Sequence, residues 1–246
     1  MIKSLNDNAA FAQGVYFRIS LREETRLQAE FLRQLSASEA YKHFVLCGGA
    51  ALHGVYLHKR RSTNLDLYAP AAVVARFQEI TQANGIEIEP TRFANSYLIA
   101  SRSHVRNDLR VGVRLTIQPN NFQRREIGKF TALSSGDVSV SVLPLADLFV
   151  QKLILVAQRH RAIDVLDLWL ALRDRPDVKD AMKHLLRVNP SALGAQIFSA
   201  DVIVARIKSF KGLWKESLRG VVYPVPEFDE VQRDLQSWLS AFRTIR

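Results

Sequence analysis

The chain has 246 residues, of which 48% are hydrophobic and 24% are charged, so it can form one large or two small domains with a packed core. Its single cysteine, Cys47, excludes a disulfide framework and a cysteine-based metal site. The sequence shows neither a signal-peptide pattern nor an apolar run of about 18 residues, so we expect a cytoplasmic protein without membrane spans. The net charge of +10 favours an anionic partner, such as nucleic acid, a nucleotide or an acidic protein, over a basic surface without one.

The first part of the chain predicts helices and strands around a glycine turn. Residues 22–41 carry apolar side chains at helical spacing, and the short apolar run at 44–47 predicts a strand. Gly48-Gly49 predicts a tight turn, because glycine readily adopts positive φ and lets other groups approach the backbone. A helix is expected at 50–58 and a second strand at 64–68.

The middle of the chain changes from helical to alternating periodicity. Residues 71–83 predict a helix that begins after Pro70 and ends at Asn84-Gly85. From there to residue 142, apolar and polar side chains alternate, as in strands with one buried face. The strands are expected at 86–88, 96–100, 109–117 and 138–142.

Pro144 marks the start of a helical region. Helices are predicted at 145–158, 161–173, 177–187, 200–210 and 228–242. We therefore predict an α+β protein with two domains. Residues 1–143 would form a mixed β-sheet with flanking helices, and residues 144–246 a helical domain.

The glycine turn and the second strand carry the first group of candidate functional residues. Asn64 and Asp66 are two residues apart on a strand, so their side chains project from the same face. A carboxylate and an amide oxygen there are suitable ligands for Mg²⁺ or Mn²⁺. The simpler alternatives are that Gly48-Gly49 is only a structural turn and that Asp66 is only a polar strand residue.

A second group lies on the two helices that follow Pro144. Lys152 interrupts an otherwise apolar helix, so its ammonium group must reach solvent or meet an anion or acid. Asp164 and Asp167 are three residues apart and share one face of the next helix. An ion pair from Lys152 to either aspartate, joining the two helices, is the structural alternative to a functional site.

The order of these motifs resembles that of the AbiEii/AbiGii toxin family, which has a nucleotidyltransferase-like fold. The resemblance rests on Gly48-Gly49, on residues 60–68 (Arg-Arg-Ser-Thr-Asn-Leu-Asp-Leu-Tyr), and on Lys152 with the acid-rich helix after it. It implies that Gly48-Gly49 and Ser62 hold nucleotide phosphates and that the acids of an Asp-x-Asp strand hold divalent metal. In this chain Asn64 stands in the place of the first of those acids, so the motif is degenerate.

The resemblance also implies a third acid on a following strand. The polar face of the strand at 109–117 shows Arg110, Arg114 and Thr116 and no acid, which leaves Asp108 or another strand as its source. On the next domain, the resemblance implies that Lys152 faces the triphosphate and that Asp164 and Asp167 support it. The residue before Asp164 is isoleucine, where the family usually has arginine.

These features lead to two functional hypotheses. The first is a toxin of a toxin–antitoxin or abortive-infection system, with a cognate antitoxin as partner. It would transfer a nucleoside monophosphate from an NTP, with Mg²⁺ or Mn²⁺, to an RNA acceptor such as tRNA. The second is a catalytically degenerate protein that binds nucleotide, RNA or a protein partner without transfer, as the single carboxylate at Asp66 suggests.

Overall fold

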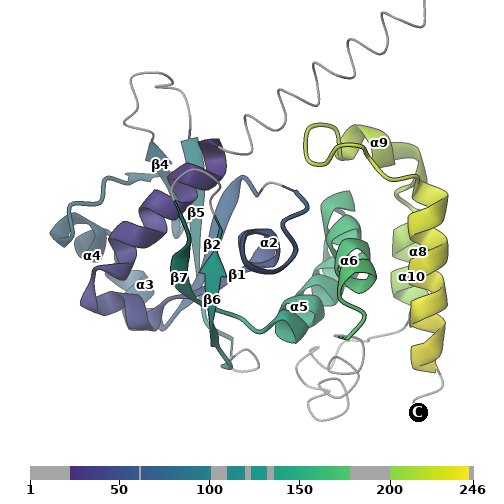
Figure 1. The fold of residues 1–246 in the computed structure, drawn as a ribbon, viewed down its shortest axis with the longest axis horizontal. Coiled ribbons are helices and arrows are strands. Elements are labelled where there is room, and N and C mark those ends of the chain that lie inside the picture. The colour runs from purple at the N-terminus through teal and green to yellow at the C-terminus, as the bar shows by residue number, and fades with distance from the viewer. Residues whose placement is uncertain are drawn as a thin grey trace, which may run out of the picture. The chain divides into compact units, whose positions relative to one another are not determined.

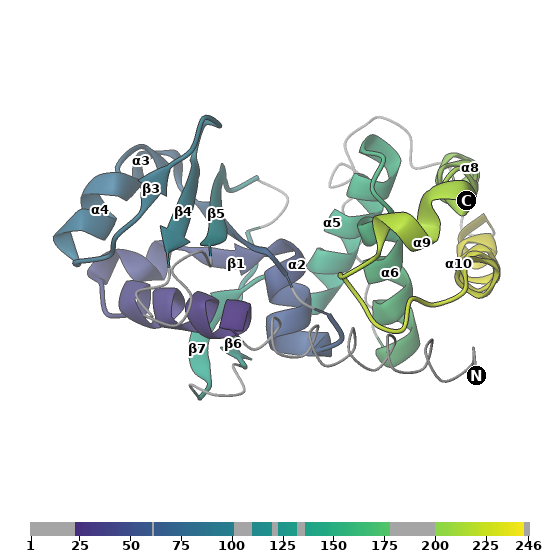
Figure 2. The same ribbon diagram turned by 90° about the horizontal axis from the view of Figure 1, so that it is seen from above.

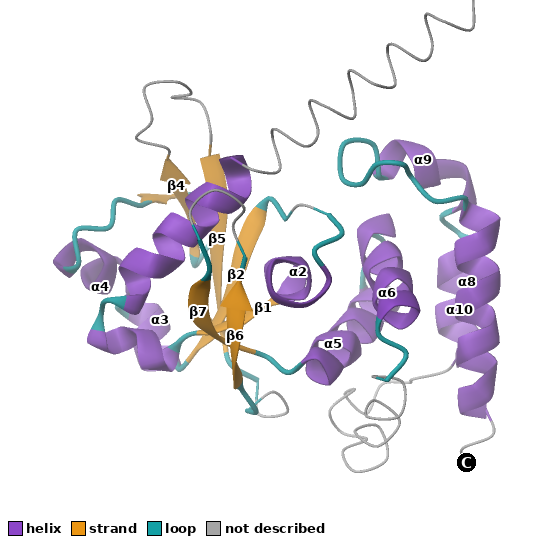
Figure 3. Ribbon diagram, viewed as in Figure 1, coloured by secondary structure: helices purple, strands orange, loops and turns teal. Residues whose placement is uncertain are grey.

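The structure is a computed structural model that describes residues 23–60, 62–100, 110–119, 123–131, 136–177 and 200–243. The chain divides into two compact units. Unit 1 is Met1–Ile117 with Ile127–Ser141, and unit 2 is Gln118–Glu126 with Val142–Arg246. Figure 1 traces the chain through both, and Figure 3 shows the strands and the helices in separate colours.

The strands form one seven-stranded mixed sheet in the order β3-β4-β5-β2-β1-β7-β6. The β2 strand pairs parallel to β5 and antiparallel to β1, and β5 and β3 each pair antiparallel to β4. The mixed sheet confirms the predicted α+β class. The strands are β1 (Val45–Cys47), β2 (Asn64–Ala69), β3 (Glu89–Pro90), β4 (Ser96–Ala100), β5 (Arg110–Ile117), β6 (Glu126–Phe130) and β7 (Val138–Val142).

The two central strands, β2 and β5, have one apolar and one polar face, because side chains alternate along a strand. Apart from Ile117 at the end of β5, their odd-numbered residues are buried and form part of the core, among them Leu65, Leu67, Val111, Val113 and Leu115. The even-numbered residues Asn64, Asp66, Gly112 and Arg114 project from the other face and are only half-buried. The alternation therefore places the candidate residues of β2 on a face that ligands can reach.

Several helices of unit 1 accompany the sheet, including the short 3-10 helix η1 (Glu39–His43). The first has its described part at residues 23–36, and α3 (Ala71–Ala75) and α4 (Phe77–Ala83) follow β2. Phe77 begins α4 and packs edge-on against Phe44 and obliquely against Tyr97 of β4, which places α4 beside that strand (Figure 2). The predicted helix at 71–83 is broken at Arg76, whose ψ of 13° departs from helical geometry.

The helix after the glycine turn differs from its prediction. It begins at Gly48 rather than at residue 50, as α2 (Gly48–Ala51), and continues as a π-helix, η2 (Leu52–Leu57). The carbonyl of Gly54 accepts a hydrogen bond from the Thr131 amide, and the amide of His58 donates to the carbonyl of His53, five residues earlier. The bond from His58 to His53 spans five residues, as π-helical bonds do, and His58 ends the turn with a φ of 54°. Such π-turns often occur at functional sites.

Unit 2 is built mainly of helices. These are α5 (Leu145–Gln158), α6 (Ala162–Asp174), α8 (Ala200–Lys208), η4 (Lys211–Leu213), α9 (Trp214–Ser217) and α10 (Phe228–Arg243). The indole of Trp169 on α6 donates to Asp234 on α10, and the indole of Trp214 on α9 donates to the Pro226 carbonyl. In the described chain, no helix is both long and apolar enough to cross a membrane.

Other predicted helices and strands differ from the structure or lie outside the residues that it describes. The strand predicted at 86–88 is wrong, because only Glu89–Pro90 pairs with β4. The β6 strand was not predicted, and its side chains are largely exposed, so it lacks the alternation that marks a half-buried strand. Most of the helix predicted at 177–187, together with Asp108 and Leu109, lies outside the described residues.

Candidate functional site

Gly48 brings the start of α2 against the side chain of Asp66. Its φ is +66°, a conformation that residues with a side chain rarely adopt. A Cβ atom at this position would lie 2.5 Å from Oδ2 of Asp66. Glycine is therefore needed at this position for two reasons, the backbone conformation and the space that the carboxylate occupies.

Gly49 makes room for two polar side chains from the link before β2. A Cβ atom on Gly49 would lie 2.8 Å from Nη2 of Arg60 and 3.3 Å from Oγ of Ser62. Arg60 is only 5% exposed, so its guanidinium lies within the fold rather than in solvent. The Gly48-Gly49 turn thus gathers Asp66, Arg60 and Ser62 around the end of β1.

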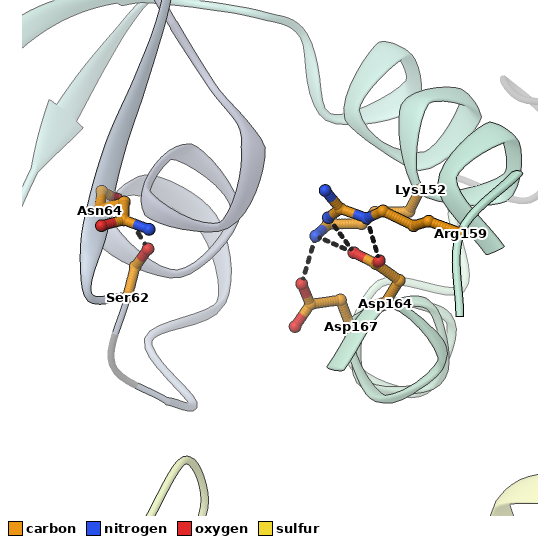
Figure 4. A network of polar contacts seen from close by, with 6 residues as sticks. All are labelled: Ser62, Asn64, Lys152, Arg159, Asp164 and Asp167. Atoms are coloured by element: carbon orange, nitrogen blue, oxygen red, sulfur yellow. Dashed lines mark hydrogen bonds and ion pairs between the residues drawn. The ribbon is translucent and has the colours of Figure 1, made fainter. Parts of the chain in front are cut away.

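Hydrogen bonds fix the position of Ser62. Its hydroxyl donates to the backbone carbonyl of Asn64 at 2.8 Å, and its own carbonyl accepts from Nε2 of Gln28 at 2.6 Å. Figure 4 shows the Ser62 hydroxyl directed towards Asn64. Ser62 also lines a cavity of ≈ 200 Å³ together with Gln28, His53, Gly54, Arg60 and Phe130.

The register of β2 and β5 decides which groups lie beside Asn64 and Asp66. Asn64 is paired with Gly112, and its side-chain oxygen occupies the space that a Cβ atom on Gly112 would need. Asp66 is paired with Arg114, whose Nε lies 3.3 Å from Oδ1 of the carboxylate. Thr116 lies opposite Tyr68, two pairs further along. The cross-strand neighbour of Asp66 on β5 is therefore a cation.

The Asp66–Arg114 pair is accessible to solvent and to ligands. The Arg114 side chain is 43% exposed and that of Asp66 is 30% exposed. Ion pairs of this kind typically contribute only about 0–1 kcal/mol to folding stability, because water screens them. A ligand that competes for either partner therefore has little stabilisation to overcome.

In unit 2, Lys152 is buried between two carboxylates. Its Nζ lies 2.9 Å from Oδ1 of Asp164 and 2.7 Å from Oδ2 of Asp167, and all three side chains are almost completely buried (Figure 4). The pairs join α5 to α6, as the ion-pair alternative predicted. A buried charge needs such partners, since removing one of them typically costs about 3–5 kcal/mol.

Arg159, at the end of α5, completes this cluster. Its Nε and Nη2 donate to the two oxygens of Asp164 at 2.7 and 2.9 Å, so the aspartate is held by two cations. Burial alone would raise the pKa of Asp164, but the hydrogen bonds from Arg159 and the charge of Lys152 outweigh it and hold that pKa below its usual value. Asp164 stays ionised, and the four charges of the cluster sum to zero.

The residues of β2 fit a single divalent cation better than a pair. Asp66 supplies one carboxylate and Asn64 an amide oxygen, and Mg²⁺ in proteins is often held by one or two carboxylates together with substrate phosphates. Among the described residues, no three or more His, Cys, Asp or Glu side chains gather in a way that could hold a metal ion. A centre with two ions held by protein carboxylates is not formed by this part of the chain.

Comparison with known proteins decides the family. A family model described as "Nucleotidyl transferase AbiEii toxin, Type IV TA system" matches residues 30–239. The chain belongs to the AbiEii family. The predicted relationship to nucleotidyltransferase toxins of toxin–antitoxin systems is thereby confirmed. No curated protein sequence matches the chain.

The solved structure of MenT4 supports the fold of this AbiEii-family chain. MenT4, a nucleotidyltransferase toxin from Mycobacterium tuberculosis H37Rv, superposes with a TM-score of 0.65 at 19% identity, covering 90% of this chain and 84% of MenT4. JHP933 from Helicobacter pylori gives a TM-score of 0.48 at 14% identity, covering 89% of this chain and 90% of that one. At this identity, the likeness to MenT4 shows the fold alone.

Two residues near the AbiEii-family motifs were not among the predicted site residues. Arg114 was recognised only as part of a basic strand face, because periodicity gives the face but not the register with β2. Arg159 lies just past the end of α5, outside the helical pattern, yet it provides an arginine beside Asp164. The isoleucine before Asp164 thus does not leave that carboxylate without an arginine partner.

Proposed function

We propose that this AbiEii-family protein transfers a nucleoside monophosphate from an NTP to an RNA acceptor such as the 3′ end of tRNA. In this reaction an acceptor hydroxyl oxygen forms a bond to the α-phosphorus, and the bond from that phosphorus to the bridging oxygen of pyrophosphate breaks. Pyrophosphate leaves, and the hydroxyl proton passes to solvent. Catalysis of such a transfer depends mainly on positioning the reacting groups and on stabilising the negative charge of the phosphates.

The observation that carries this proposal is the contact between Gly48 and Asp66. It puts a turn with positive φ against the accessible carboxylate of β2, and the Ser62 hydroxyl lies beside the second glycine of that turn. Gly48, Gly49 and Ser62 would hold the phosphates, because the backbone amides of a glycine turn and a hydroxyl are suitable donors to phosphate oxygens. Asp66, with the amide oxygen of Asn64, would hold a Mg²⁺ or Mn²⁺ ion that neutralises phosphate charge.

For unit 2 we propose the roles that the family resemblance implies. Lys152 would neutralise charge of the triphosphate, and Asp164 and Asp167 would hold its ammonium group in place through their 2.9 and 2.7 Å contacts. Arg159 would support Asp164. The burial of Lys152 agrees with a lysine whose position is fixed rather than with one that moves freely in solvent.

The partners that we propose are an NTP, an RNA acceptor and a cognate antitoxin protein. The net charge of +10 supports an RNA acceptor, since phosphate contacts by lysine and arginine supply much of the affinity for nucleic acids. The antitoxin follows from the family, whose description includes a toxin–antitoxin system.

Transfer can be tested with purified protein, each of the four α-labelled NTPs, Mg²⁺ or Mn²⁺, and total tRNA. We expect labelled RNA from the wild-type protein and loss of at least about 100-fold in Asp66→Ala, because the only carboxylate of the β2 face is removed. Glu89→Ala is the matched control, since Glu89 is an exposed acid of β3. Equal labelling by both variants would exclude Asp66 from the reaction.

The Asp66–Arg114 pair and Asn64 favour one further candidate, a protein that binds nucleotide without transferring it. This candidate predicts NTP binding by the wild-type protein but no labelled RNA under any of these conditions. Labelling that is lost in Asp66→Ala and kept in Glu89→Ala rules it out.

A further inference from the structure

The sheet register fixes Arg114 beside Asp66. In the parallel pairing of β2 and β5, Asp66 lies directly opposite Arg114, and Asn64 lies opposite Gly112. On its other side Arg114 is paired with Ser96 of β4, a small neutral residue. The arginine is therefore placed beside Asp66 by backbone pairing along a central strand of the sheet.

The carboxylate of Asp66 is bounded on two sides. Oδ1 lies 3.3 Å from Nε of Arg114, and Oδ2 is the atom that a Cβ atom on Gly48 would meet. Both charged side chains remain partly exposed, so a phosphate that approaches the Gly48 turn can reach the guanidinium. The guanidinium offers a planar set of N–H donors that matches the geometry of phosphate oxygens.

The charge of this face differs from that of a two-metal centre. Two divalent ions carry four positive charges and are normally held by a group of carboxylates. Here the Asp66–Arg114 pair sums to zero, its paired neighbours Asn64, Gly112 and Ser96 add no charge, and Arg110 on the same face of β5 adds only a positive one. The guanidinium repels a second cation and at the same time supplies positive charge for a triphosphate.

We propose that Arg114 takes the place of one of the two metal ions, so that the protein binds an NTP with at most one divalent cation. The guanidinium contacts phosphate oxygens of the nucleotide directly and contributes to binding even without metal. This proposal rests on the proposed function only in that an NTP binds on the face of β2 that carries Asp66.

The first measurement is NTP binding by calorimetry in EDTA and in Mg²⁺, for wild-type protein, Arg114→Gln and Arg114→Lys. We expect the wild-type protein to bind NTP in EDTA, and Arg114→Gln to weaken that binding about tenfold or more, as loss of a charge-assisted hydrogen bond does. Arg114→Lys should recover part of the affinity because it keeps the charge. Arg110→Gln, which removes a charge from the same face of β5 outside the pairing with β2, should stay within about twofold of wild type.

The second measurement counts bound Mn²⁺ by electron paramagnetic resonance in the presence of NTP. We expect one ion per chain in the wild-type protein and two in Arg114→Asp, which places a second carboxylate opposite Asp66. Arg114→Asp should also lose metal-free NTP binding. Thermal unfolding of each variant verifies that it is folded.

The outcomes separate this inference from the proposed function. Two Mn²⁺ ions in the wild-type protein, or equal metal-free binding by Arg114→Gln and Arg110→Gln, overturns the role of Arg114 while labelling of RNA still supports transfer. Absence of NTP binding by the wild-type protein, with or without metal, overturns both. Metal-free binding that depends on Arg114, without labelled RNA, supports the inference and contradicts transfer.

Discussion

At the scale of single residues, Gly48 and Asp66 depend on one another. The positive φ of Gly48 turns the chain from β1 into α2, and the missing side chain leaves space for the Asp66 carboxylate. The Sγ atom of Cys47 adds a contact to the Asp66 carbonyl at 3.3 Å. The position of the carboxylate is therefore set by backbone conformation, which makes it sensitive to a single methyl group.

Gly48→Ala tests this dependence. The left-handed conformation costs about 1–2 kcal/mol for a residue with a side chain, and the new Cβ atom must also displace Asp66. We expect lower stability in urea together with loss of NTP binding and of RNA labelling. Gly85→Ala is the matched control, because Gly85 has a φ of +65° and open space around it. If Gly48→Ala keeps nucleotide binding as Gly85→Ala does, the contact with Asp66 is not functional.

The sequence predicts how side chains on one strand lie relative to one another, but not how side chains on different strands do. Alternation along β2 predicts that Asn64 and Asp66 share a face, and the structure has them so. The same alternation on β5 gives a polar face with Arg110, Arg114 and Thr116, but not their register against β2. That register joins strands far apart in the sequence and is fixed by the packed sheet, which pairs Asp66 with Arg114.

At the scale of elements, buried charges join α5 and α6. Lys152 comes from an otherwise apolar stretch of α5, and both of its carboxylate partners come from α6. Helical periodicity predicted both helices and the shared face of Asp164 and Asp167. Arg159 could not be placed in this way, because its φ and ψ of −128° and 150° lie outside the helix and follow from how α5 ends.

Lys152→Met tests whether this cluster stabilises unit 2. The substitution keeps an unbranched side chain one atom shorter but leaves Asp164 and Asp167 with one cation fewer, so we expect the free energy of unfolding to fall by about 3–5 kcal/mol. Lys215→Met is the control. It removes an exposed pair with Glu227 and should change stability by less than about 1 kcal/mol. Equal urea midpoints for the two variants would contradict a stabilising role for the buried cluster.

At the scale of the whole chain, the class of the fold could be predicted but its details could not. The order of helices and strands gives a mixed sheet followed by helices, since alternation and helical spacing persist over long stretches. The β6 strand and the π-turn of η2 depend on contacts between distant segments, such as the hydrogen bond from Thr131 to Gly54. Local sequence patterns carry no signal for contacts of that kind.

The net charge of +10 leads to a prediction for the RNA acceptor. Binding of tRNA should weaken as NaCl rises from about 50 to about 200 mM, with a slope of about −3 in a double-logarithmic plot if roughly four phosphates are contacted. Filter binding and RNA labelling should fall together over this range. Labelling that persists at high salt would contradict an acceptor held by phosphate contacts.

Periodate oxidation of the tRNA removes its terminal hydroxyl groups. If the 3′ end is the acceptor, oxidised tRNA is bound as before but is no longer labelled. Binding by charge alone, without transfer to the 3′ end, predicts no difference in labelling between oxidised and intact tRNA.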